Sequence, residues 1–176
     1  MTPSEIQNVL AAHSANLSRA YLYGANLSGA NLSGADLSGA KGINKYRTTP
    51  LYGLLAQIGP IRMYKLTTPD GVGPYNGGIE YKVGETYEVY GADCDEQHAC
   101  GAGINLADLP WCMNQWQPGY RIFVAEFTAE DIACIPCASD GKFRVKRCTI
   151  VAEKNLTELG LIESPAPITE VATCQQ

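Results

Sequence analysis

Histidine, long apolar runs and positive charge are all scarce in this 176-residue chain. The two histidines, His13 and His98, leave no readable Ser-His-Asp or Cys-His triad, so we expect no nucleophilic catalysis. No segment approaches the roughly 18 apolar residues of a membrane span, and the N-terminus lacks the basic and apolar regions of a secretory signal. The sequence therefore predicts a cytoplasmic protein, in a prokaryote, without membrane contact.

Positive charge falls short of negative charge across the chain. Its 13 Lys and Arg against 18 Asp and Glu give a formal net charge of −5. Direct binding to a DNA or RNA backbone needs a concentrated basic face. We therefore expect no such binding.

Cysteine occurs seven times, and this odd number fits reduced thiols packed as small hydrophobic residues. A zinc site is the alternative, because Cys134 and Cys137 form a CxxC pair and Cys94, His98 and Cys100 cluster upstream. No second CxxC occurs at zinc-ribbon spacing. We therefore expect no metal and no cofactor, and we rank a disulfide between Cys94 and Cys100 below the zinc site.

A five-residue repeat dominates the beginning of the chain. It reads ANLSGANLSGADLSGA at residues 25–40, with alanine at every fifth position from Ala15 and leucine at every fifth position from Leu17. Neither the helix period of 3.6 nor the strand period of 2 can hold both columns on one buried face, so the chain must turn at each unit. Asn, Asp, Ser and Gly fill the other positions and suit tight turns. Each unit is thus predicted to form one short side of a square coil.

This pattern over residues 15–41 resembles the pentapeptide-repeat family, whose A(D/N)LXX units build a right-handed, four-sided β-helix. The resemblance implies little more than one coil here, and solenoids need about three stacked units to bury a core. The coil must then rest on the rest of the chain from Gly42 onward. At its other end, the capping box at residues 2–5 predicts a capping helix over residues 1–14.

Some members of that family imitate DNA and thereby inhibit gyrase, a role that needs rows of carboxylates. Residues 15–41 hold one acid, Asp36, against two bases, Arg19 and Lys41. We therefore do not expect this chain to imitate DNA. The end of the coil could instead pair with a second copy, so a homodimer is a possible assembly.

The remainder predicts an α+β fold with mainly antiparallel strands. We expect a connecting helix over residues 42–60, an α+β domain over residues 61–162 and a flexible tail over residues 163–176. Thr49 is the expected cap of the connecting helix, whose apolar face is Leu51, Leu54, Leu55 and Ile58. Strands are expected at 61–66, 79–83, 85–89, 120–127, 132–136 and 141–151. The segment from Ile104 is expected to be the end of a strand, followed by a helix after the cap Asp108, and a capping-box turn is expected at 128–131.

Five segments of this domain, in order, are similar to a domain of small phage proteins of unknown role, shared in part with rIIB-type phage proteins. They are YKL at Tyr64, IEYKVGETYEV, CGAGINLADLPWCMNQW, RIFVAEFTAEDIACIP and GKFRVKRC, within residues 62–150. The resemblance implies a phage or prophage accessory protein in the cytoplasm of a bacterial host. The histidine usual in that domain is Asn105 here, and an amide can bind a ligand but cannot act as a general base.

The function that we favour is non-catalytic binding to a host protein, in a counter-defence role such as that of an anti-CRISPR inhibitor. Exposed tyrosines would supply contact area at low entropic cost. The tyrosines expected to be exposed are Tyr21, Tyr23, Tyr46, Tyr52 and Tyr75. The simpler interpretation is that they cover the seam between coil and domain.

Two alternatives stay open. The order of motifs faintly resembles an ADP-ribosyltransferase, in which Arg62 or Tyr64 would hold the nicotinamide dinucleotide and Glu126 would orient the acceptor, although an ordinary strand residue explains Glu126 more simply. The other alternative is a protein that sequesters a small nucleotide. Its phosphate stripe would be Lys142, Arg144 and Lys146 with Arg121 and Lys65, and its stacking surface Trp111 or Trp116.

The candidate binding residues combine these interpretations, with no catalytic and no metal-ligating residue among them. They are Tyr21, Tyr23, Tyr64, Lys65, Asn105, Trp111, Arg121, Lys142, Arg144 and Lys146.

Overall fold

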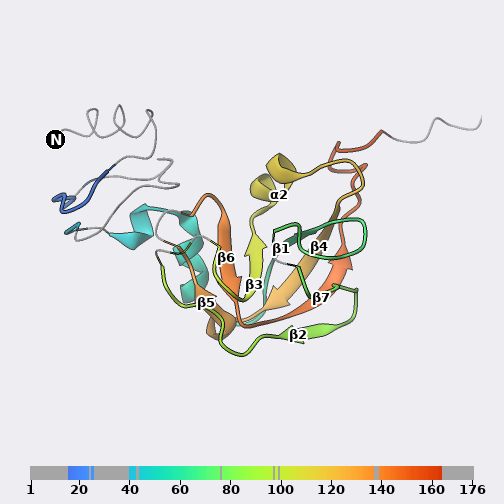
Figure 1. Cartoon of the computed structure of the whole chain (residues 1–176), viewed down its shortest axis with the longest axis horizontal. Coiled ribbons are helices and arrows are strands. Elements are labelled where there is room, and N and C mark those ends of the chain that lie inside the picture. Colours follow the sequence, from blue (N-terminus) through green and yellow to red (C-terminus); the bar gives the residue numbers. More distant parts are fainter. Residues whose placement is uncertain are drawn as a thin grey trace, which may run out of the picture.

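The computed structural model describes most of the chain after the repeat (Figure 1). The described residues are 16–23, 25, 40–42, 44–75, 77–96, 98, 100–136 and 139–163. The predicted capping helix, most of the repeat and the tail from residue 164 lie outside them. None of the helices that are described has the length and apolar character needed to cross a membrane.

Short helices and seven strands make up the described chain. The helices are η1 (Lys45–Arg47), η2 (Pro50–Ala56), α2 (Leu109–Gln115) and η3 (Ala129–Asp131). The strands are β1 (Ile61–Thr67), β2 (Thr86–Glu88), β3 (Ile104–Ala107), β4 (Arg121–Phe127), β5 (Ile132–Cys134), β6 (Lys142–Val145) and β7 (Arg147–Glu153).

The strands form one sheet in the order β2-β7-β4-β1-β3-β6-β5, and the described pairings are all antiparallel. This confirms the prediction of a mainly antiparallel sheet with few helices. β6 and β7 are separated by Lys146 alone, yet four other strand pairings lie between them in the sheet order. The sheet must therefore curl until its two sides meet at this residue, as Figure 1 shows.

The predicted single strand at 141–151 is accordingly wrong, because the chain bends at Lys146. The N–H of Lys146 donates to the carbonyl of Asp131, and its own carbonyl accepts from the N–H of Val89. Both partners lie outside β6 and β7, so the ladder cannot continue through this residue. The bend passes the chain from one side of the curled sheet to the other.

The two faces of the sheet carry separate apolar clusters. The inner cluster includes Phe123, Phe143 and Ile150, each with no exposed surface. The outer cluster forms beneath α2 and includes Trp111 and Cys112. Alternation along each strand sends neighbouring side chains to opposite clusters, as expected for a sheet covered on both faces.

The helix after Thr49 begins as predicted, but its buried face differs. The Thr49 side chain accepts a hydrogen bond from the N–H of Leu51, and Pro50 occupies the first turn. The helix is a 3-10 helix in which Tyr52 is 1% exposed and donates through its hydroxyl to the carbonyl of Ile135 at 2.8 Å. Ile58 is fully exposed, because the chain turns to an extended conformation after Ala56. The predictions that Tyr52 is exposed and Ile58 buried are wrong.

Two other predicted caps form as expected, whereas the strand predicted at 79–83 is wrong, because among the described residues only an isolated bridge joins Glu80 to Val72 there. The Asp108 side chain caps α2 by accepting from the N–H of Trp111 at 2.8 Å. Residues 128–131 form the predicted capping box between Thr128 and Asp131. Gly84, with a φ of +92°, lies in the turn before β2, where the sequence predicts a break.

The described part of the repeat has buried leucines and a parallel bridge between repeats. Leu17 and Leu22, in the leucine column, are 1% and 2% exposed. A parallel bridge joins Tyr21 to Lys41, four five-residue units further along, and the N–H of Leu22 donates to the carbonyl of Lys41 at 2.7 Å. The inward leucine column is thus confirmed at these positions.

Candidate functional site

A cleft opens where β1 and β3 separate. Within the described residues these strands pair at one position, Tyr64 with Ala107. Beyond it the Lys65 ammonium, instead of a backbone N–H, donates to the carbonyl of Asn105 at 2.9 Å. The separation leaves a cleft lined by Lys65, Leu66, Gly73, Pro74, Tyr75, Cys100, Asn105, Leu106, Ala107, Trp111 and Lys142.

Lys65 lies at the inner end of this cleft and is only 5% exposed. Desolvation by burial lowers the pKa of Lys65 from 10.5 to about 8. The Tyr81 ring, 4.8 Å from the ammonium, offers a cation–π contact. Across the described part of the chain, no carboxylate forms an ion pair with this ammonium. A buried charge with one hydrogen bond and no counter-ion is costly.

A second lysine and two aromatic rings form the rim. The Lys142 ammonium lies 5.3 Å from the centre of the Trp111 ring and 3.2 Å from the Cys100 sulfur. The Tyr75 and Trp111 rings meet edge to face at 6.3 Å. The Trp111 indole N–H donates to Asp140 at 3.0 Å, which fixes the ring against the opening. The rim thus presents a cation beside an aromatic surface.

The strands that border the cleft each carry a buried polar atom without a hydrogen-bond partner among the described residues. These atoms are the Thr67 hydroxyl on β1 and the Asn105 side-chain oxygen on β3. Asn105 donates from its amide nitrogen to Gly101 and Gly103, which leaves the oxygen as an available acceptor. Buried polar atoms are nearly always paired. Of these two residues Asn105 lines the cleft, so its oxygen is suited to bonding a ligand or water there.

A neighbouring opening adjoins the cleft and shares Lys65 and Cys100 with it. Its lining is otherwise apolar or glycine, including Ile79, Tyr81 and Gly103. The linings of both openings, as far as they are described, contain lysine and no carboxylate. A chain with a net charge of −5 therefore has a locally positive site.

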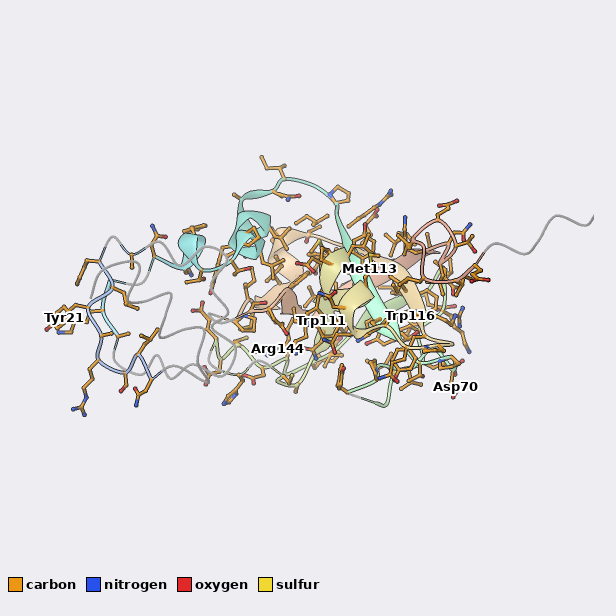
Figure 2. All side chains as sticks on the ribbon, turned by 90° about the horizontal axis from the view of Figure 1, so that it is seen from above. Tyr21, Asp70, Trp111, Met113, Trp116 and Arg144 are labelled. Carbon is orange, nitrogen blue, oxygen red and sulfur yellow. The ribbon has the colours of Figure 1, made fainter. Side chains whose placement is uncertain are left out.

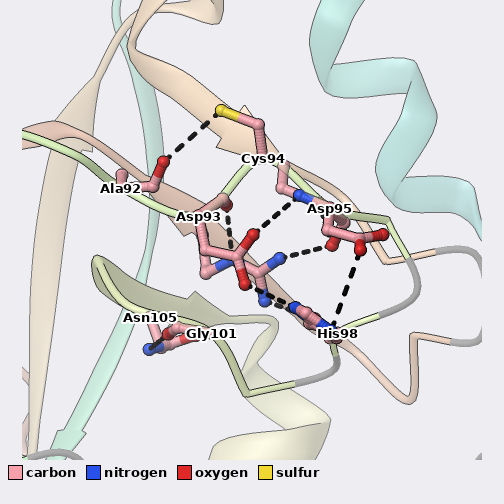
Figure 3. Close-up of polar contacts among 9 residues, drawn as sticks. Ala92, Asp93, Cys94, Asp95, His98, Gly101 and Asn105 are labelled. Carbon is pink, nitrogen blue, oxygen red and sulfur yellow. Dashed lines mark hydrogen bonds and ion pairs between the residues drawn. The ribbon is translucent and has the colours of Figure 1, made fainter.

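Arg144 shapes the wall of the site and is not available to a ligand. Its guanidinium has no exposed surface and donates to the carbonyls of Asp93, Asp95 and His98 (Figure 3). The prediction that Arg144 contributes to a phosphate-binding stripe is therefore wrong, because its guanidinium is buried on backbone carbonyls. Arg144 instead holds the loop at residues 93–98, which leads to the segment that lines the cleft.

The same loop carries a carboxylate–imidazole pair. His98 Nδ1 lies 2.8 Å from Asp93 Oδ2, and this hydrogen bond raises the pKa of His98 (Figure 3). Hydrogen bonds from the Asp95 N–H and then from His98 lower the pKa of Asp93. The Asp93 side chain also leaves no room for a Cβ atom at Gly101. This loop is consequently packed against the start of the segment that contains Asn105.

The structure brings together four candidates from the sequence, Lys65, Asn105, Trp111 and Lys142. Tyr64 does not line the cleft and packs within the apolar cluster beneath α2. Arg121 forms a two-bonded ion pair with Glu153 at 2.9 and 2.7 Å, and Lys146 is exposed at the bend.

The residues of the ADP-ribosyltransferase interpretation form an ordinary cross-strand pair. Arg62 and Glu126 lie opposite each other on β1 and β4, and their side chains form an ion pair at 2.8 Å. Trp116, the alternative stacking residue, is partly buried and donates its indole N–H to the carbonyl of Tyr120. None of these three side chains lines the cleft.

The remaining candidates, Tyr21 and Tyr23, lie on the coil and are 74% and 73% exposed. Figure 2 shows Tyr21 at the end of the molecule away from Trp111. The Lys41 ammonium lies 5.5 Å from the Tyr21 ring, and the Tyr23 ring covers Gly42. The coil and the cleft are therefore separate surfaces.

Sequence reasoning did not assign Tyr75 or Cys100 to this site. Both come from irregular segments without periodicity, and the signal that marks the Tyr75 loop is its run of Gly and Pro between residues 69 and 78. Such a run indicates a loop but not where the loop folds.

The cysteines of the described chain are free thiols. Cys94 and Cys100 are exposed, whereas burial raises the pKa of Cys112 and Cys148 to about 12 and that of Cys134 to about 11. No group of three possible metal ligands occurs among the described residues. Cys137 of the CxxC pair lies outside them.

Comparison with known protein families gives a match at the beginning of the chain. Residues 13–41 match the family model described as pentapeptide repeats, with eight copies. No curated protein and no solved structure matches the chain. This segment therefore consists of pentapeptide repeats, which imply a β-helix. The match does not include the curled sheet or its cleft.

Proposed function

We propose that this protein binds a small nucleotide-like anion in the cleft between β1 and β3 and releases it unchanged. The observation that carries the proposal is Lys65, a buried ammonium that adjoins the cleft and has no ion-pair partner among the described residues. An anion in the cleft would supply the missing counter-charge. Charge-assisted hydrogen bonds of this kind are about twice as strong as neutral ones.

The cleft also suits the planar part of a nucleotide. Trp111 is fixed by Asp140 and offers a ring beside the Lys142 ammonium, which can reach a phosphate oxygen. The Asn105 side-chain oxygen is an acceptor suited to an amino or imino group of a base. Stacking on an aromatic side chain contributes about 1–3 kcal/mol per base. The site therefore combines anion recognition with recognition of an aromatic ring.

Binding rather than turnover is proposed because of the side chains available. The described lining contains lysine, amide, thiol and aromatic groups, but neither a carboxylate nor an imidazole that could move a proton from a nucleotide. Such a site could sequester a small signalling nucleotide, a role that requires tight binding but no catalysis.

A thermal-shift panel tests the proposal. Nucleoside 5′-monophosphates and cyclic dinucleotides are compared with the matching nucleosides, which lack phosphate. A ligand at 100 times its Kd stabilises the folded protein by about 2.7 kcal/mol. We expect a phosphate-dependent rise in Tm that Lys142→Met weakens by about 10–100-fold in Kd, as loss of a charged hydrogen bond predicts.

Lys146→Met is the matched control, since Lys146 is exposed at the bend and does not line the cleft. It should bind like the natural protein. Equal stabilisation by nucleosides and nucleotides, or none by any compound, would contradict the proposal.

A second candidate function is binding of a host protein by a phage or prophage accessory protein, in a counter-defence role. The supporting observation is the pair Tyr21 and Tyr23, two large exposed side chains close together on the coil. Tyrosine offers rigid contact area. A pull-down from bacterial lysate should recover one partner with the natural protein and lose it with Tyr21→Ser combined with Tyr23→Ser. Retention by that double variant would rule out this surface.

A further inference from the structure

Lys65 is a buried lysine whose side chain contributes to the linings of both openings, and such an amine can do more than pair with an anion. Its side chain crosses the separation between β1 and β3 and ends at the floor of the two adjoining openings. One N–H is fixed on the carbonyl of Asn105, and the Tyr81 ring covers the nitrogen at 4.8 Å. When uncharged, such an amine keeps its lone pair for another partner. A desolvated lysine in an apolar pocket is the usual setting of an amine nucleophile.

We propose that Lys65 is a covalent site, whose amine forms an imine with the carbonyl group of an anionic aromatic aldehyde bound in the cleft. The inference rests on the proposed anion site, because Lys142 would hold the anionic group and Trp111 the ring. It names a second ligand class for the same cleft, in which the ligand shares the anionic group and the aromatic ring of a nucleotide and also carries a carbonyl carbon that reaches Lys65.

The chemistry needs no oxidant or reductant. The nitrogen lone pair attacks the carbonyl carbon, and the carbon–oxygen π bond breaks as the oxygen takes up a proton. The nitrogen loses a proton, which gives a neutral carbinolamine. That carbinolamine loses its hydroxyl group and the remaining N–H proton as water, leaving the carbon–nitrogen double bond. The reverse reaction releases the aldehyde, so the site captures its ligand reversibly.

The protonation state of the lysine favours this reaction. With a pKa of about 8, a substantial fraction of Lys65 is neutral near pH 7.5, whereas a lysine with its ordinary pKa is almost entirely charged. Lys82 provides the contrast, because its hydrogen bond to Glu80 raises the pKa of this exposed lysine. Exposure alone would favour reaction at Lys82, while amine availability favours Lys65.

The test uses pyridoxal 5′-phosphate as the probe, because it is an anionic aromatic aldehyde. The full-length protein is incubated with it, reduced with borohydride to fix any imine, digested and mapped by mass spectrometry. We expect labelling at Lys65 at least about tenfold faster than at Lys82, which follows from the larger neutral fraction. Pyridoxal, which lacks the phosphate, should label Lys65 more slowly. Lys142→Met should slow labelling by the phosphate compound only.

The decisive comparison is between labelling of Lys65 and labelling of Lys82 within the natural protein, so a folding defect in a variant cannot obscure it. Labelling of Lys82 and other exposed lysines with Lys65 spared would overturn the inference. If Lys65 is spared while nucleotides still raise the Tm, the anion site stands and the covalent chemistry fails. If Lys65 is labelled at equal rates by both aldehydes, the phosphate has no part, and both the anionic ligand class and the proposed function fail.

Discussion

Lys65 is buried in the folded protein, and burying its positive charge lowers the free energy of unfolding by an amount that should depend on pH. The unfolded chain keeps this proton up to its usual pKa of 10.5, whereas the folded chain releases it near 8. The unfolded state therefore binds more protons between pH 8 and 10.5, so stability rises with pH in this window. At 1.36 kcal/mol per pKa unit, the full effect is about 3 kcal/mol.

Urea unfolding across this pH window measures the effect. Lys65→Met should remove the rise and be more stable than the natural protein below pH 8, since its side chain needs no counter-ion. Lys82→Met, at an exposed position, should keep the rise. Parallel pH profiles for Lys65→Met and the natural protein would show that Lys65 is not desolvated.

His98 should titrate above the usual pKa of 6.5, because it is hydrogen-bonded to Asp93. A group whose pKa is raised on folding adds stability below its unfolded pKa and loses that contribution as the pH rises through the folded value. Asp93→Asn should return the His98 pKa toward 6.5 in an NMR titration. Glu88→Gln, an exposed change on β2, should leave it raised. The same midpoint in Asp93→Asn and the natural protein would contradict the assigned pair.

At the scale of elements, α2 depends on its first turn. Asp108 accepts from the Trp111 N–H and so fixes the residue that forms the aromatic side of the cleft. Asp108→Ala should cost about 1 kcal/mol of folding free energy, whereas Asp108→Asn keeps an acceptor oxygen and should cost less. Urea unfolding distinguishes the two. An equal loss in both variants would mean that the charge, not the cap, stabilises the helix.

Elements with their own local signals were predictable from the sequence. Thr49 with Pro50 marks η2, and Asp108 marks α2, because a cap is a contact between residues a few positions apart. The bend at Lys146 was not predictable, since its hydrogen bonds come from Asp131 and Val89. Burial of Tyr52 depends in the same way on Ile135, a residue far along the chain.

At the scale of the whole molecule, the cleft is a product of sheet topology. The sequence suggests Lys65, Lys142 and Trp111 as parts of a nucleotide site because of their chemistry. It places Arg144 with them by strand alternation, but that alternation cannot show that the loop at residues 93–98 folds over the guanidinium. Nor can it show that β1 and β3 pair at one position and then separate, which creates the cleft.

The repeat segment and the curled sheet give the molecule two separate surfaces. We expect the repeat segment to need support from the rest of the chain, since solenoids need about three stacked units to bury a core. The exposed Tyr21 lies away from Trp111 (Figure 2). We therefore expect substitutions on one surface to leave the binding proposed for the other surface unchanged.

The pKa of Lys65 with and without a bound nucleotide tests the central claim most directly. NMR of the lysine side-chain carbon next to the ammonium should give a midpoint near 8 in the free protein. With a nucleotide bound, a phosphate oxygen near the ammonium should raise that midpoint toward 10.5, and a nucleoside should not. A midpoint that stays near 8 with the nucleotide bound would contradict the proposed site.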